Sequence, residues 1–121
     1  DILNGKVINI GINFRVVPAL DANKYDVLQN CVSKLQNRFI ANKFNIGEPI
    51  YISEIYQLLN QVPGVVDTTD VEIINLTGGV YSNYVYDIGA NLSSDGRYLL
   101  MSESAAAEVL VPGTDISGVV T

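Results

Sequence analysis

The side chains that could do acid–base or metal chemistry in this 121-residue sequence are mainly carboxylates, because histidine is absent. Histidine is the usual general base near neutral pH, and it also belongs to the common nucleophilic triads and zinc sites. A pair of carboxylates brought together by the fold, as in a glycosidase, is the alternative that the composition leaves open. No motif indicates a cleft that would raise the pKa of one such acid, so we predict no catalytic residue and no enzyme activity.

The closest group of acids is Asp67, Asp70 and Glu72. These three carboxylates could hold calcium, but their spacing does not match the loop of an EF-hand. We expect solvated charges at the start of a strand, and cation binding by these three residues is left as the alternative. No other metal ligand and no cofactor are predicted, since a phosphate-binding loop of the GxxxxGK[ST] type is absent as well.

Cys31 is the only cysteine, so no disulfide can form within the chain. Neither a CxxC motif nor a histidine is present to activate its thiol. We therefore expect Cys31 to behave as a small buried apolar residue rather than as a nucleophile.

Charge is distributed unevenly along the sequence, which carries thirteen acids, seven bases and a net charge of −6. Residues 1–43 hold six bases and three acids, whereas residues 44–121 hold one base and ten acids. An acidic chain is a poor ligand for nucleic acid, because phosphate contacts need clustered lysine and arginine. The two halves predict either ordinary solvated charge or head-to-tail attraction, with the basic part of one copy facing the acidic part of another.

A strand is predicted over residues 7–17, where apolar and polar side chains alternate. A strand covered on one face only favours a mixed or antiparallel sheet. Pro18 is expected to end the strand, since proline cannot donate to a ladder. The alternation predicts a buried face made of Ile8, Ile10, Ile12, Phe14 and Val16.

An amphipathic helix is predicted next, over about residues 23–40. Asp21 or Asn23 is expected to cap its N-terminus, because both side chains can accept hydrogen bonds from the first free backbone amides. Apolar residues recur at spacings of three and four, which predicts a core-facing stripe of Tyr25, Leu28, Val32, Leu35 and Phe39.

A turn is expected at residues 45–47, and residues 50–52 can form either a short strand or the lead-in to a second helix. Ser53 is the predicted cap of that helix, and Pro63 with Gly64 should end it. A further strand is then predicted over residues 65–75. The apolar stripe of the second helix is expected to be Ile52, Ile55, Leu59 and Val62.

After Asn75 the sequence becomes rich in glycine, and short β-prone runs alternate with turns at residues 80–86, 97–101 and 107–111. Asp95-Gly96 and residues 112–115 are turn signals. We therefore predict an α+β protein. Two amphipathic helices should pack on one face of a mixed or antiparallel sheet, as a β-α-α-β core over residues 1–75. Residues 76–121 are expected to add a glycine-rich β-meander or arm within the same single domain.

Several segments resemble the C-terminal module of the baseplate J-like family, the inner-ring wedge core proteins of contractile phage tails. Residues 3–18, LNGKVINIGINFRVVP, resemble its first strand, and residues 21–39, DANKYDVLQNCVSKLQNRF, the helix that follows. The most specific segment is residues 45–73, NIGEPIYISEIYQLLNQVPGVVDTTDVEI. GRYLL and VPGTDISGVV resemble the end of such proteins. The likeness covers structural residues and transfers no active site.

The resemblance implies a structural protein of the virion, located in the tail baseplate and assembled in the host cytoplasm. Its partners would be copies of itself, as a dimer or a ring, and other baseplate wedge proteins. Because the sequence starts at Asp1 without an initiator methionine, we expect a fragment of a longer protein. The alternative is a stand-alone α+β ligand-binding or regulatory domain.

An assembly module needs contact residues, and the β-prone end of the chain is where we expect them. Tyrosine combines an apolar body with a polar tip and is enriched at interfaces, so Tyr81, Tyr84 and Tyr86 are expected either in the core or on a contact surface. An exposed strand edge can pair with another chain. No apolar run is long enough to cross a membrane. The predicted interface residues are Tyr81, Tyr84, Tyr86, Val109, Val111, Ile116 and Val119.

Overall fold

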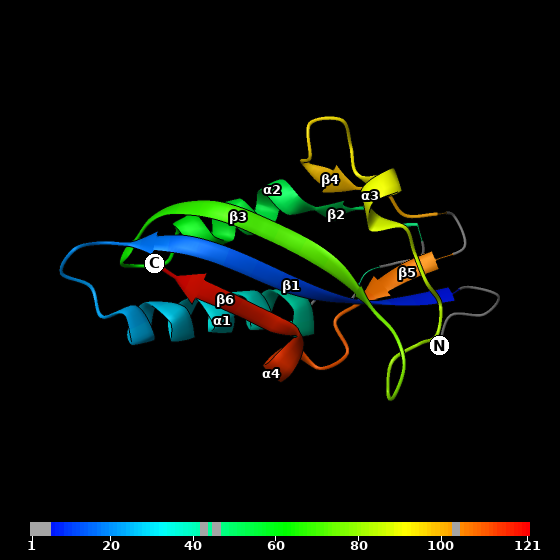
Figure 1. Ribbon diagram of the computed structural model, residues 1–121, viewed down its shortest axis with the longest axis horizontal. Coiled ribbons are helices and arrows are strands. Elements are labelled where there is room, and N and C mark those ends of the chain that lie inside the picture. The colour runs from blue at the N-terminus through cyan, green and yellow to red at the C-terminus, as the bar shows by residue number, and fades with distance from the viewer. Residues whose placement is uncertain (1–5, 42–43, 45–46, 103–104) are drawn as a thin grey trace.

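The computed structural model describes residues 6–41, 44, 47–102 and 105–121 and shows an α+β protein with a mixed sheet (Figure 1). This confirms the predicted fold class. The elements in chain order are β1 (Lys6–Pro18), α1 (Lys24–Ala41), β2 (Ile50–Tyr51), α2 (Ile52–Asn60), β3 (Val65–Leu76), α3 (Ile88–Asn91), β4 (Tyr98–Leu99), β5 (Ala105–Glu108), α4 (Pro112–Asp115) and β6 (Ile116–Val120).

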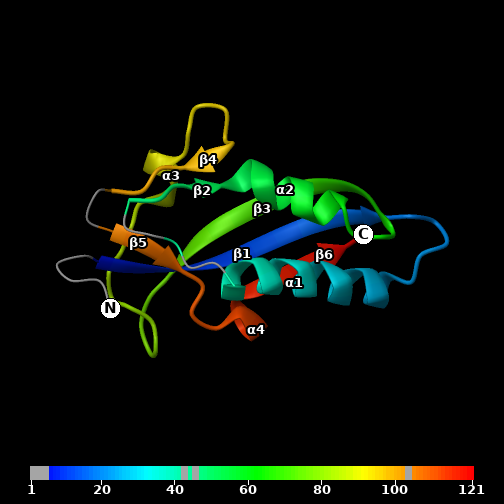
Figure 2. The same ribbon diagram turned by 180° about the vertical axis from the view of Figure 1, so that it is seen from behind.

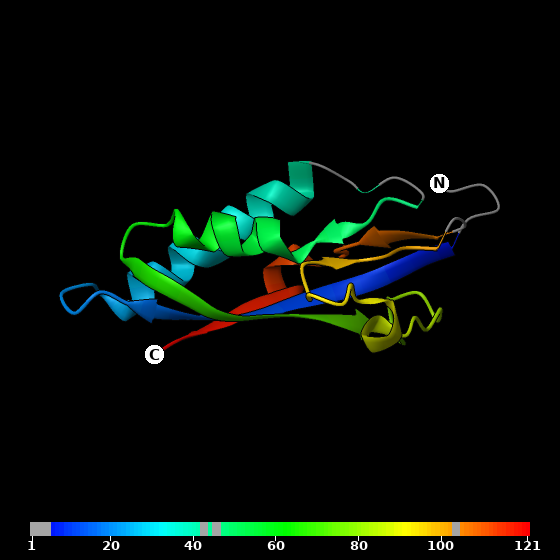
Figure 3. The ribbon, with the colours of Figure 1, turned by 90° about the horizontal axis from the view of Figure 1, so that it is seen from above.

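The long strand β1 is the centre of the main sheet. Along one side it pairs with β3 in antiparallel orientation. Its other side pairs in parallel orientation with two short strands in turn, first β5 and then β6 (Figure 1). β2 and β4 form a separate two-stranded antiparallel sheet. Both α1 and α2 lie on one face of the main sheet, and in the described part of the chain no helix covers the opposite face of β1 and β6 (Figure 3).

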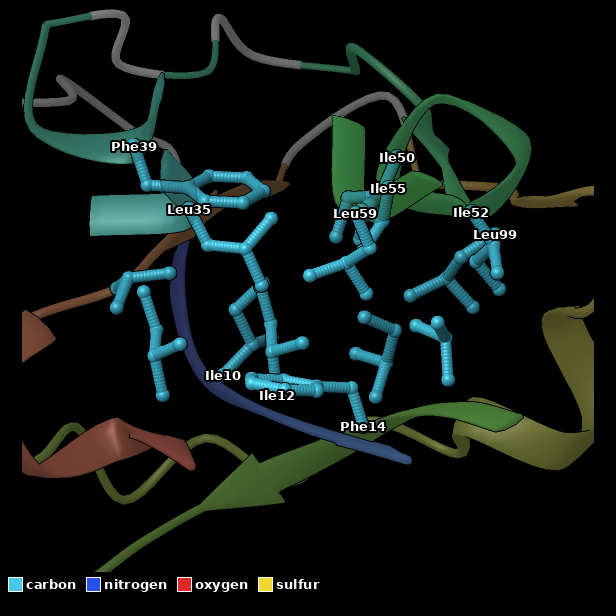
Figure 4. Packing of buried hydrophobic residues seen from close by; sticks show 14 of the residues in the cluster. Ile10, Ile12, Phe14, Leu35, Phe39, Ile50, Ile52, Ile55, Leu59 and Leu99 are labelled. Atoms are coloured by element: carbon cyan, nitrogen blue, oxygen red, sulfur yellow. The ribbon is translucent and has the colours of Figure 1, made fainter. Parts of the chain in front are cut away.

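The core lies between that face and the two helices. The five apolar side chains predicted for the buried face of β1 are all buried, which confirms the period-two pattern. Figure 4 shows Leu35 and Phe39 of α1 pointing toward Ile10 and Ile12 of β1. Leu59 enters the same cluster from α2. Leu99 of β4 is fully buried as well and closes the core beside α2.

Helix α1 begins as predicted, because the Asn23 side chain accepts hydrogen bonds from the amides of Tyr25 (2.9 Å) and Asp26 (3.2 Å). Its predicted core stripe was wrong at one end. Tyr25 is 68% exposed, while Val27 and Cys31 are buried together with Leu35 and Phe39. The residues of α1 that face the sheet are four positions apart, and the bulky Tyr25 on the first turn lies outside this stripe.

Helix α2 buries Ile52, Ile55 and Leu59, as predicted, and Val62 just beyond its end is buried too. The prediction of a Ser53 cap was wrong, since the helix begins at Ile52 after a Tyr51 N-cap with no side-chain hydrogen bond. An ion pair of 2.7 Å between Arg38 Nε and Glu54 Oε2 joins α1 to α2.

The connection from α2 into β3 turns at Gly64, which adopts a φ of 90°. A side chain is strained in that left-handed region, so glycine suits the turn. Gly64 also accepts a hydrogen bond of 2.8 Å from the Ala19 amide, which ties this turn to the one after β1. Part of the predicted turn at residues 45–47 lies outside the described residues; Gly47 itself has a φ of 76°.

The C-terminal part does not form the predicted meander or arm. β5 and β6 complete the main sheet in parallel with β1, whereas a meander would have paired consecutive strands in antiparallel orientation. Residues 80–86 contain no strand, and the turn predicted at residues 112–115 is the one-turn helix α4. The reason is that β5 and β6 bury their apolar side chains by pairing with a strand about a hundred residues away, which no local pattern reveals.

Among the described residues, no helix combines the length and the apolar character that a bilayer crossing requires.

Candidate functional site

The seven predicted interface residues do not share one surface. The side chains of Val109 and Ile116 are buried in the core, because the pairing of β6 with β1 turns Ile116 toward the helices, so neither side chain is exposed to a partner. Val111 is half-buried in the turn before α4. Val119 is 43% exposed and lies on the uncovered face of β6.

The three tyrosines hold their segment onto the sheet. The Tyr81 hydroxyl donates a hydrogen bond of 2.6 Å to Asp115 Oδ1, which raises the pKa of Tyr81. The Tyr86 hydroxyl donates to the Leu100 carbonyl at 2.9 Å, and burial raises the pKa of Tyr86. Tyr84 and Tyr86 are partly buried against the core cluster. The structure therefore gives all three an intramolecular role, which leaves their use by a partner a prediction.

Residues 77–87, here called the strap, cross the end of the sheet near β5 and are fixed by two asparagines. Asn9 is buried, and its Oδ1 accepts a hydrogen bond of 2.6 Å from the Ser82 amide while its Nδ2 donates to Glu108 at 3.1 Å. Asn75 Oδ1 accepts from the Tyr86 amide at 2.8 Å. Side chains from β1 and β3 thus satisfy the backbone of a segment that has no strand partner of its own.

The start of β6 is set by Asp115, the buried acid that ends α4. Its Oδ2 accepts from the Val111 amide at 3.2 Å, and its Oδ1 accepts from Tyr81. These bonds close the turn that carries the chain from β5 back to the edge of the sheet. In Figure 1, α4 lies below the start of β6, and β6 runs along β1. Asp115 therefore positions β6 and links it to the strap.

β6 is one outer strand of the main sheet, and among the described residues it pairs with β1 alone. The Thr121 amide donates to the Val16 carbonyl at 3.1 Å, so the alternate residues Val119 and Ser117 also direct their backbone groups toward β1. The backbone groups of Gly118 and Val120 consequently face away from the sheet. Residues 116–121 carry no charged side chain and no proline. We call this outward side of residues 116–120 the β6 edge.

The outer strand on the opposite side of β1 is β3, and it has two features that limit pairing with a further strand. Asp67, Asp70 and Glu72 are exposed along it. Its register with β1 shifts twice, between Arg15 and Val16 and between Val17 and Pro18. Charged side chains and bulges are the common means of protecting a sheet edge. The β6 edge has neither.

A groove of about 320 Å³ runs beside the β6 edge, between that strand and α1. Figure 2 shows α1 lying across β6 on the helix-covered side of the sheet. Carboxylates, lysines and arginines are all missing from the lining. The side chains and backbone that line the groove are those of Leu28, Gln29, Val32, Ser33, Gln36, Gly113, Ile116, Ser117 and Gly118.

The chemical possibilities of this region are those of a binding surface. The groove lining has no group that could act as a general base, a nucleophile of lowered pKa or a metal ligand of the usual kinds. In the described part of the chain, His, Cys, Asp and Glu side chains form no cluster of three that could hold a metal. The structure therefore does not bring Asp67, Asp70 and Glu72 together as a cation site.

Cys31 is fully buried in α1, and burial raises the pKa of its thiol to about 11. A thiol of that pKa carries almost no thiolate near neutral pH, and the thiolate is the reactive form. The sequence-based interpretation of Cys31 as a small buried apolar residue is confirmed.

Sequence reasoning missed the groove between α1 and β6. One signal was available in the run of residues 116–121, which combines β-branched residues with the absence of charge and proline. The polar side chains of α1 at the groove, Gln29, Ser33 and Gln36, carried no such signal, because a solvated helix face has the same composition.

Comparison of the sequence with models of protein families and with curated proteins finds no match.

Proposed function

We propose that this chain is a non-catalytic assembly module that binds other protein subunits through the β6 edge. The observation that carries the proposal is the contrast between β3 and β6, outer strands on opposite sides of β1. β3 is charged and bulged, whereas β6 offers unpaired backbone groups on a strand without charge. Strand addition at such an edge gives affinity through main-chain hydrogen bonds.

The biological setting that we propose follows from the resemblance of the sequence to baseplate wedge proteins. In this setting the module lies in the tail baseplate of a contractile-tailed phage and contacts copies of itself and other wedge proteins. The two helices on β1 and β3 would be the stiff body of the module. The strands after Asn75, held to that body by Asn9 and by pairing with β1, would present the docking edge.

The proposal is tested by measuring mass in solution, by light scattering, for the chain alone and mixed with the wedge proteins of a contractile-tailed phage. We expect a species heavier than one 13.1 kDa chain. Val120→Pro should remove that species, because the substitution deletes an outward backbone donor on an edge strand, where proline is tolerated. Circular dichroism would show that the variant remains folded. A single-chain mass in every mixture would contradict the proposal.

A second candidate function is small-molecule binding in the groove between α1 and β6. Its volume of about 320 Å³ is at the lower end of the range for ligand pockets. The lining, rich in glutamine and serine, is more polar than most such pockets. A compound that binds the monomer and is displaced by Val32→Trp would favour this alternative over assembly.

A further inference from the structure

This inference rests on the proposed function and uses the different charge of the outer strands β3 and β6 to identify the partner. We infer that the β6 edge pairs with the β6 edge of a second copy in antiparallel orientation, around a two-fold axis at Gly118, so that two sheets become one continuous sheet.

Charge selects a second copy at this edge. The chain has a net charge of −6, so most ways of bringing two copies together oppose like charges. At the β3 edge, a self-pairing would place Asp67, Asp70 and Glu72 opposite the same acids of the other copy. Neither residues 116–121 nor the lining of the neighbouring groove has a charged side chain. Of the outer strands β3 and β6, β6 is therefore the one at which two copies meet without charge repulsion.

The backbone pattern fits a pairing centred on Gly118. Because the groups of Gly118 and Val120 face outward, Gly118 of both copies can exchange two hydrogen bonds across the axis. Ile116 then lies opposite Val120 of the second copy, and Ser117 lies opposite its Val119. The even-numbered residues point toward the helices and the odd-numbered residues toward the open face in both chains. Each face of one sheet therefore continues into the same face of the other.

Side-chain properties fit the same arrangement. Ser117 and Val119 would form two cross-strand pairs on the open face, where Val119 is 43% exposed in the single chain. Pairing would cover this β-branched side chain, which is favourable in a strand. Gly118 presents no side chain at the axis, and its own contact with the Phe14 ring lies toward the core. The two-fold axis is perpendicular to the sheet, so both α1 helices remain on one side.

The test uses the fact that hydrogen-bonded and non-hydrogen-bonded residue pairs alternate along two antiparallel strands. Ser117 and Val119 of the second copy would form a non-hydrogen-bonded pair with Cα atoms about 4.5 Å apart. That separation permits a disulfide, whereas residues two positions off on the diagonal are about 7–8 Å apart and too distant. We expect a mixture of Ser117→Cys and Val119→Cys chains to cross-link after oxidation with diamide. Either variant alone should remain uncross-linked.

Two controls accompany this experiment. Val66→Cys, on the β3 edge and 66% exposed, should not cross-link with Ser117→Cys. The wild-type chain should not cross-link either, because Cys31 is buried. Equal cross-linking of the single variants, or none in the mixture, would overturn the two-fold pairing. If Val120→Pro still abolished binding to the wedge proteins in that case, the proposed function would stand with a different partner at the edge. If no mixture contained a species heavier than one chain, both proposals would fail.

Discussion

The parts of the chain before and after Leu76 are held together in different ways. Residues 6–76 bury continuous stripes of apolar side chains: alternate residues of β1 meet residues at steps of three and four on α1 and α2. Residues 77–121 also bury apolar side chains, among them Leu99 and Ile116, but they depend in addition on polar side chains and on parallel pairing with β1. Asn9, Asn75 and Asp115 fix the strap and the start of β6. The first part is thus stabilised mainly by burial, whereas the second part combines burial with specific hydrogen bonds that position the strap and the start of β6.

The difference teaches where stability and binding reside in this fold. Apolar burial contributes most to folding free energy, whereas individual hydrogen bonds contribute about 1 kcal/mol each. The hydrogen bonds of the C-terminal part can therefore be removed at a smaller cost than the core side chains, and this part includes the proposed docking edge. Substitutions confined to one of the two parts would separate the contribution to stability from the contribution to binding.

The largest effect is expected in the core of the first part. Leu35→Ala or Leu59→Ala should lower the free energy of unfolding by about 2–5 kcal/mol, because each removes a fully buried side chain and leaves a cavity. Chemical denaturation measures this loss. Leu20→Ala is the matched control, since Leu20 is fully exposed and should change stability by less than about 0.5 kcal/mol. An equal change at all three positions would remove the distinction between core and surface.

A smaller loss is expected where β6 meets β1. Gly118 lies against the ring of Phe14, which would collide with an added Cβ. Gly118→Ala should therefore lower stability by about 1–3 kcal/mol through forced repacking. Gly113→Ala is the control within the same C-terminal part, because a Cβ at Gly113 meets open space. Equal melting temperatures for the two variants would contradict the packing of the Phe14 ring against Gly118.

Removing the hydrogen bonds that hold the strap should lower the free energy of unfolding by less than the changes above. Asn9→Ala removes the acceptor of the Ser82 amide and the donor to Glu108. We expect a loss of about 1–2 kcal/mol, concentrated in the strap as faster amide exchange. Asn83→Ala, at an exposed position of the same segment, is the control. Uniform acceleration across α1 and β1 would show instead that Asn9 supports the whole fold.

The smallest effect should be a loosening of the strap at alkaline pH. The pKa values of Tyr81 and Tyr86 are raised in the folded chain, the first mainly by the bond to Asp115 and the second mainly by burial. A raised folded pKa favours the neutral phenol. The resulting stability is complete below the ordinary tyrosine value of about 10 and is lost as pH rises through the folded values.

Amide exchange of the strap should accordingly accelerate above about pH 10, before exchange in the helices does, after correction for the intrinsic pH dependence of exchange. A variant carrying both Tyr81→Phe and Tyr86→Phe should lack this alkaline step. Persistence of the step in that variant would assign it to other groups.

The sequence predicted the first part well because its signals are local. The period-two pattern of β1, the Asn23 cap and the stop at Gly64 each depend on neighbouring residues. Even there the stripe of α1 was displaced at Tyr25, because the sheet that selects the buried face is distant in sequence.

The second part and the candidate site could not be predicted in the same way. Parallel pairing of β5 and β6 with β1 joins residues about a hundred positions apart, and no turn sequence specifies it. Val109 and Ile116 were therefore assigned to the surface although the sheet buries them. The lack of charge on residues 116–121 was visible, but its meaning depended on knowing that β6 is an outer strand.

Hydrogen–deuterium exchange of the chain at rising protein concentration tests the central claim, that the β6 edge is the assembly surface, most directly. The outward amides of Gly118 and Val120 should gain protection as the chains associate, while the amides of the outer strand β3 should not change. Association accompanied by protection of β3, with β6 exchanging as in the single chain, would contradict the claim.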